Sequence, residues 1–304
     1  MKRIIRWLPL VCMAIGFATL NGHGGEDEEF IVEQNNQLIL VDPDQRIWEM
    51  TEVLTEDMYT ITGRFRRQAM SVLSHEVAYI QRQLALTDDQ KGLTANLPAD
   101  ANNLEGPVRA VKLEQIVKAN YWNQIVKRVT EGRFNNASRL ILYTFKTDET
   151  INTVWPWART EATYYLGEQY LSEGNYTKAV DCFTEILTKA PKSRFAMSAT
   201  LKTGQAYIGA GEYRKADEIF NDADTNSLSA KMLIAYEAGV ASASSNDRIK
   251  LRPVGELWRM RFRAYKALNL KAEVVAGRGD PQNALRALRR SEEHTSELQS
   301  RITI

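Results

Sequence analysis

One short motif returns four times in this chain and limits what the chain can fold into. In each copy a glycine lies five residues before an alanine, at Gly132, Gly174, Gly211 and Gly279, and three of the four copies carry an aromatic residue in between. Successive glycines are 42, 37 and 68 residues apart, and the last interval fits two periods. A turn that recurs about every 30 to 40 residues is typical of a solenoid of helical hairpins.

The second copy, residues 160–193, is the clearest. Gly167 and Ala179 are small and predict a close crossing of two helices, while Pro191 predicts the end of the second helix. Gly174 predicts the turn between them. The remaining positions that define the repeat are aromatic residues that fill space around the crossing, Tyr170, Tyr176 and Phe183. On these residues the segment resembles a tetratricopeptide repeat, and the run from Ala190 to Ser193 resembles the linkers of the bacterial envelope type.

The third copy repeats this pattern at a constant offset of 37 residues, in Gly204, Tyr207, Gly211, Tyr213, Ala216, Phe220 and Ala223. The first copy is degenerate, because Gln124 and Arg128 stand where apolar residues are usual, and the last copy is cut short. The resemblance covers residues 119–289 and is strong over 160–223. It implies an all-α fold, a right-handed solenoid of helical hairpins that we expect over residues 107–289, with its best repeats at 160–193 and 197–226.

The resemblance also implies where a partner binds. In such proteins the first helix of each hairpin forms an inner surface that can hold a peptide or a helix. The matching positions are Trp122, Val126, Tyr164, Glu168, Leu201 and Gln205. Trp122 and Tyr164 could instead pack against the neighbouring repeat. The paired lysines and asparagines with which some family members hold a terminal carboxylate are absent from these positions.

The N-terminal third is divided by composition. Residues 1–22 join three basic residues to a short apolar run, the pattern of a cleaved secretory signal, with an inner-membrane anchor as the alternative. Residues 23–45 form an acidic leader that we expect to be flexible, in which 38–41 could be a strand. Apolar residues at helical spacing from Ile47 to Phe65 and beyond predict helices over 47–86, divided at Gly63, and residues 87–107 predict a linker. We therefore expect a helical N-terminal region and linker over 46–106.

The C-terminal tail has a different origin. Residues 290–300 resemble the conceptual translation of a sequencing adapter, so we expect 290–304 to be an artefact and the natural protein to continue past Arg289.

Charge argues against nucleic acid as the main partner, because the formal net charge is +1. It is unevenly placed, since residues 23–58 hold eleven acidic residues and one basic, and residues 248–289 hold eleven basic and three acidic. The simple interpretation is solvated helix faces and a soluble leader. The alternatives are that the two ends meet, or that the basic segment binds an acidic protein or makes peripheral contact with an anionic membrane through Arg259, Arg261 and Arg263.

The sequence contains little that predicts catalysis. It has no paired cysteines for zinc, no histidine pair at metal-ligand spacing and no glycine-rich phosphate loop after a strand. Cys12 belongs to the signal, which leaves Cys182 alone on a repeat helix as a small buried residue. We expect no enzyme activity, no cofactor and no metal.

Together these observations predict an exported scaffold that binds a protein or peptide partner in the bacterial cell envelope, in the periplasm or outside the cell. One alternative is the N-terminal docking or regulatory region of a larger envelope enzyme truncated after Arg289. Another is an accessory protein of outer-membrane assembly or polysaccharide export.

Overall fold

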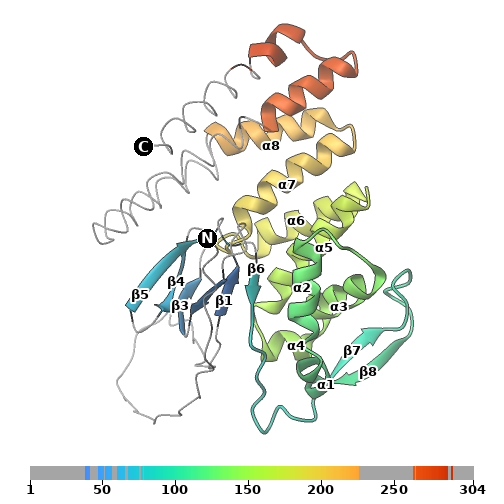
Figure 1. Ribbon diagram of the computed structural model, residues 1–304. Helices are drawn as coiled ribbons and strands as arrows, with labels where there is room; N and C mark the ends of the chain where they lie inside the picture. Colours follow the sequence, from blue (N-terminus) through green and yellow to red (C-terminus); the bar gives the residue numbers. More distant parts are fainter. Residues whose placement is uncertain are drawn as a thin grey trace, which may run out of the picture. The chain divides into compact units, whose positions relative to one another are not determined.

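The computed structural model describes residues 38–41, 47–50, 52–56, 60–65, 68–74, 77, 79–225, 263, 265–286 and 289. Within these residues, antiparallel strands come first along the chain and helices follow (Figure 1). The predicted all-α fold is therefore wrong for the N-terminal part and right for the residues that follow it. The predicted signal segment, the acidic part of the leader before residue 38 and the tail after residue 289 lie outside the described residues.

Six short strands occupy the region for which the spacing predicted helices. They are β1 (Leu38–Val41), β2 (Ile47–Met50), β3 (Glu52–Glu56), β4 (Thr60–Phe65), β5 (Gln68–Leu73) and β6 (Tyr79–Gln81). They pair in two antiparallel three-stranded sheets, with strand orders β2-β1-β6 and β3-β4-β5. Residues 38–41, where the sequence allowed a strand, form one. The prediction of helices over 47–86 is wrong for the described residues.

The error has a physical cause. Strands β2 to β5 are only four to six residues long, so each one contains two to four apolar residues, too few to distinguish a period of 2 from a period of 3.6. The apolar residues that together fitted a helical spacing lie on different strands and in the connections between them. The better signal was the β-branched content of the segment from Thr51 to Thr62, because threonine, valine and isoleucine favour the pleated sheet.

A third sheet begins inside the predicted linker and ends just after it. Strands β7 (Thr94–Pro98) and β8 (Val108–Lys112) pair antiparallel, with Asn96 opposite Ala110. Residues 108–112 are thus a strand and not the first helical residues of the repeat array. Two short elements then lead into the helices, α1 (Leu113–Lys118) and α2 (Tyr121–Thr130), with Asn120 between them in the left-handed conformation at φ 51°.

The helices form consecutive antiparallel pairs that pack on their neighbours. The first pair is α2 with α3 (Asn136–Thr147); a short helix, α4 (Glu149–Val154), then leads to α5 (Ala158–Ser172) with α6 (Tyr176–Lys189), and to α7 (Ala196–Gly209) with α8 (Tyr213–Thr225). Helix α3 packs on α5, and α6 packs on α7, so each pair contacts the next (Figure 1). This stacking of pairs agrees with the predicted repeat architecture.

Two of the predicted turns differ in detail from the clearest repeat. In the first copy three residues separate Gly132 from the first residue of α3, whereas one residue separates Gly174 from the first residue of α6. The small residue that is buried in the first copy is therefore Ser138, and the predicted Ala137 is exposed. In the last copy the left-handed residue is Gly277, at φ 71°, and not Gly279. Residues 265–275 and 281–286 are helical there, and their turn is two residues longer than predicted.

The helices share a buried core of aromatic and aliphatic side chains. Trp122 stacks on Phe145 with ring centroids 4.8 Å apart, and Phe145 lies parallel to Trp155 at 6.0 Å. The Trp155–Pro–Trp157 run therefore braces the start of α5. None of the helices in the described part of the chain has the length and apolar content needed to cross a membrane.

Candidate functional site

The two clearest repeats owe their geometry to glycines at the helix crossings. A Cβ atom on Gly167 would lie 2.7 Å from Cε1 of Phe183, and one on Gly204 would lie 2.2 Å from Cζ of Phe220. Both distances are shorter than any real carbon contact, so only glycine lets α5 approach α6, and α7 approach α8, this closely. Phe183 and Phe220 are fully buried in consequence. The close crossing predicted at Gly167 is confirmed.

Three of the six positions predicted to form the exposed inner surface are buried inside the structure. Trp122 and Val126 are fully buried and Leu201 is 5% exposed, so a partner cannot reach these side chains. The reason is local: α2 packs against α3, α5 and β6, and α7 packs against α5, α6 and α8. The alternative given for Trp122, packing inside the array, is the correct one.

Tyr164, Glu168 and Gln205 are the three that stay partly exposed. The ring of Tyr164 stacks on Phe195 with centroids 4.5 Å apart and also contacts Tyr165. Burial, followed by the charge of Glu168, raises the pKa of the Tyr164 phenol well above its ordinary value. This side chain stays neutral and serves the packing between α5 and the start of α7.

The other two positions, Glu168 and Gln205, lie beside Lys202. We call these three residues the α5–α7 polar patch. Oε2 of Glu168 lies 3.0 Å from Nζ of Lys202 and thereby joins the two helices. The second carboxylate oxygen, Oε1 of Glu168, and the amide oxygen of Gln205 are both buried without a hydrogen-bond partner among the described residues. Buried acceptors without a donor are costly. Both oxygens are closed to solvent, so a bound chain can donate N–H groups to them only when the two part-exposed side chains turn outward.

A second charged site was not predicted from the sequence. We call it the buried ion cluster, and it consists of Glu56 at the end of β3, Arg82 just after β6, Glu161 on α5 and Arg194 just before α7. Nε of Arg82 donates to Oε1 of Glu161 at 2.9 Å, and its Nη2 lies 2.7 Å from Oε2 of Glu56. Arg194 lies 3.1 Å from Oε1 of Glu56 and 3.5 Å from Oε1 of Glu161.

The cluster is neutral as a whole and nearly dry. The side chains of Arg82, Arg194 and Glu161 are at most 6% exposed, and Glu56 is 23% exposed. Burial alone would raise the pKa of Glu56, but Arg82 and Arg194 outweigh it and hold the pKa below its ordinary value. Burial would likewise lower the pKa of Arg82, yet Glu161 and Glu56 raise it. Glu56 and Arg82 therefore remain charged at neutral pH.

Aromatic rings complete the surroundings of the two guanidinium groups. Arg82 lies over the ring of Trp157 at 4.4 Å, and Arg194 lies over Phe195 at 4.0 Å. Such contacts favour an arginine that has lost its water. Each charge has an ion-pair partner, so the cluster holds strands β3 and β6 against α5 and the start of α7. Oε2 of Glu161 and two guanidinium nitrogens of Arg194 are buried without a hydrogen-bond partner among the described residues.

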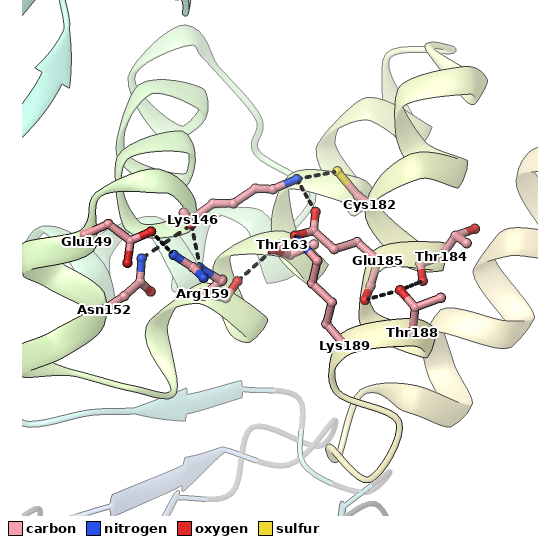
Figure 2. A network of polar contacts seen from close by, with 10 residues as sticks. All are labelled: Lys146, Glu149, Asn152, Arg159, Thr163, Cys182, Thr184, Glu185, Thr188 and Lys189. Atoms are coloured by element: carbon pink, nitrogen blue, oxygen red, sulfur yellow. Dashed lines mark hydrogen bonds and ion pairs between the residues drawn. The ribbon is translucent and has the colours of Figure 1, made fainter.

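A more exposed polar network joins α3, α4, α5 and α6 (Figure 2). Nζ of Lys146 lies 2.7 Å from Oε2 of Glu185 and 4.0 Å from the sulfur of Cys182, while Arg159 pairs with Glu149 at 2.6 Å. Burial raises the pKa of the Cys182 thiol to about 11, and the nearby ammonium only partly opposes this. Cys182 is therefore a neutral, buried thiol, as predicted.

Of the predicted basic docking residues, Arg263 is exposed at the start of the last described segment. Arg259 and Arg261 lie outside the described residues. In the part of the chain that the structure describes, no group of three or more histidine, cysteine, aspartate or glutamate side chains is placed to hold a metal ion.

Sequence reasoning missed the buried ion cluster because its members lie far apart along the chain. Arg82 and Glu161 are separated by 79 residues, and nothing local marks either as buried. The one usable signal was Glu161 itself, a carboxylate in the first turn of a repeat helix, with Ala158 and Tyr165 one turn away on the same face.

Comparison with known families places a tetratricopeptide repeat model on residues 161–193, which is the α5–α6 pair and the connection that follows it. No significant match was found among curated proteins, and none among solved structures. The chain therefore contains one repeat that is similar to the tetratricopeptide family, followed by a second helix pair, α7–α8, built on the same glycine–phenylalanine contact.

Proposed function

We propose that this chain is a protein-binding scaffold, exported to the bacterial cell envelope, that has no catalytic activity of its own. The matched repeat supports protein binding, because tetratricopeptide repeats are stacked helix pairs whose extended surfaces hold other proteins. The stacking of α3 on α5 and of α6 on α7 supplies such a surface.

The observation that carries the proposal is the α5–α7 polar patch. Its two unused acceptors, on Glu168 and Gln205, lie on the first helices of adjacent repeats. A peptide or helix terminus laid across both helices would bring backbone N–H donors to these oxygens once the two part-exposed side chains turn outward. Each neutral hydrogen bond formed in this way contributes about 0.5–1.5 kcal/mol, and one to the carboxylate about 1.5–3 kcal/mol.

The proposed export rests on the sequence of residues 1–22. Their basic start and short apolar run suit a secretory signal, and the Ala190–Ser193 linker resembles those of envelope proteins. The absence of catalysis is proposed because the charged clusters of the described residues are paired and serve packing.

Protein binding is tested by crosslinking in the cells that produce the protein. A photoreactive amino acid replaces Lys202 in the patch or, as the matched control, Lys192, which is exposed in the connection before α7. We expect irradiation to give one discrete protein adduct from position 202 and none from position 192. Equal adducts from both positions, or none from either, would remove the basis for a partner at the patch.

Export is tested on the same cells by fractionation and N-terminal sequencing. A mature chain that begins near residue 23 in the periplasmic fraction or the medium supports the proposal. A full-length chain confined to the cytosol contradicts it.

A further inference from the structure

Strand β8 has one edge that no described strand covers. The backbone N–H of Leu113 donates to Leu93, and that of Ala99 donates to Pro107, which places the odd-numbered residues of β8 in the ladder with β7. In an antiparallel pair the alternate residues turn their N–H and C=O groups the other way. The N–H and C=O groups of Val108 and Ala110 and the N–H of Lys112 therefore point outward, and none of them has a hydrogen-bond partner among the described residues. The C=O of Lys112 belongs to the first turn of α1, because Lys112 is the N-cap of that helix.

The opposite edge of this small sheet is treated differently. On β7 the outward N–H of Asn96 donates to Oδ2 of Asp148 at 2.7 Å, in the connection between α3 and α4. Asp148 is 7% exposed, so this edge is closed by the helices. The two strands thus form a sheet with one protected edge and one open edge.

A cavity of about 680 Å³ runs beside the open edge. It is lined by β8, by α1 and by the first residue of α2. Tyr121 in its wall is 37% exposed, and Val108 at the end of the strand is 57% exposed. Large apolar side chains at this exposure next to unpaired backbone groups are the features that an added strand would cover.

The charged side chains that line the cavity are of one sign. Arg109 and Lys118 line the cavity, Lys112 ends the strand, and none of the three forms an ion pair within the described residues. No carboxylate lines the cavity. A second copy of this chain would bring the same three cations of both copies together, which opposes self-pairing.

We propose that the open edge of β8 binds an acidic, extended segment of a partner protein, which adds to the sheet as a third strand. Backbone groups of Val108, Ala110 and Lys112 pair with the added strand, and its carboxylates lie near Arg109, Lys112 and Lys118. This surface is outside the helical repeats, so the inference does not depend on the proposed function of the α5–α7 polar patch.

The test uses two labelled probe peptides on the full chain, one alternating glutamate with valine and one alternating lysine with valine. Fluorescence anisotropy should show binding of the glutamate peptide only, with an affinity that falls at least tenfold between low and high salt, because exposed charges are screened. Equal binding of both peptides, or binding of neither, would overturn the inference.

Two variants separate backbone pairing from simple charge attraction. Ala110→Pro removes one outward N–H and leaves the ladder to β7 intact, because proline is tolerated on the open side of an edge strand. We expect it to weaken glutamate-peptide binding at least tenfold, while Ala110→Val, which keeps the N–H, binds like the natural chain. Should Ala110→Pro fail to fold, the double change Arg109→Glu and Lys118→Glu must abolish binding while the exposed control Lys192→Glu leaves it unchanged.

Three further results would contradict the inference. One is undiminished binding to Ala110→Pro in a folded protein. Another is a dimer in sedimentation that Ala110→Pro dissociates, because a second copy would then be the occupant. The third is binding to vesicles of anionic lipid without any binding to the glutamate peptide, because the basic side chains would then serve a membrane surface.

Discussion

Arg82 and Glu161 form a hydrogen bond of 2.9 Å between two side chains that are 6% and 2% exposed. The pair joins the residue that follows β6 to the first turn of α5, across 79 residues of sequence. Because of this pair, one face of the repeat helix α5 is covered by charged groups from the strand region. Folding of the strands and of the first full repeat should therefore be coupled.

Replacing Glu161 by alanine should destabilise the protein strongly. The change leaves Arg82 and Arg194 buried with one carboxylate instead of two, and breaking a buried pair in this way costs about 3–5 kcal/mol. Chemical denaturation measures the difference. Glu168→Ala is the matched control on the same helix, because its ion pair with Lys202 is 22–27% exposed and should cost about 1 kcal/mol or less. Equal losses from the two changes would contradict the structural role of the cluster.

Acid should weaken the protein through Glu56. A carboxyl whose pKa is lower in the folded than in the unfolded state adds stability above the unfolded value, near 4.5, and this stability is lost as the pH falls through the folded value. The free energy of unfolding of the natural chain, followed from pH 7 to pH 3, should therefore fall more steeply than that of Glu56→Gln below about pH 5. Parallel curves would show that the pKa of Glu56 is not lowered by folding.

The helix pairs could be predicted from the sequence because their evidence is local. Gly167 and Phe183, or Gly204 and Phe220, are close in sequence and recur at a fixed offset, so one pair supports the other. Strands β2 to β5 could not be predicted because each is too short to reveal its period. The buried ion cluster and the edge of β8 depend on contacts between distant segments, which one sequence does not record.

Alanine at the two crossing glycines should be destabilising in a graded way. Alanine has the higher helix propensity by about 1 kcal/mol, but its Cβ would overlap a buried phenylalanine ring, and such overpacking costs about 1–3 kcal/mol or more. Gly204→Ala should lower the melting temperature more than Gly167→Ala, since its contact is shorter. The double change Gly204→Ala and Phe220→Leu should recover part of the loss. A gain in stability from either single change would show that the helices are farther apart than described.

Cys182 should resist thiol reagents in the folded protein. With its pKa raised to about 11, about one part in a thousand is thiolate at pH 8, and the side chain is 3% exposed. A Cys12→Ser variant, treated with a disulfide reagent at pH 8, should react slowly when native and rapidly in denaturant. Fast labelling of the native protein would contradict the burial of this thiol.

The most direct test of the scaffold account is the affinity of the protein for the partner crosslinked at Lys202. It should be measured by titration calorimetry with the natural chain and with the double variant Glu168→Ala and Gln205→Ala. The account predicts at least a tenfold loss of affinity with little change in melting temperature, because the variant removes two acceptors that the free protein does not use and one part-exposed ion pair, with Lys202, worth about 1 kcal/mol or less. Unchanged affinity in a stably folded variant would contradict the claim that the α5–α7 polar patch holds the partner.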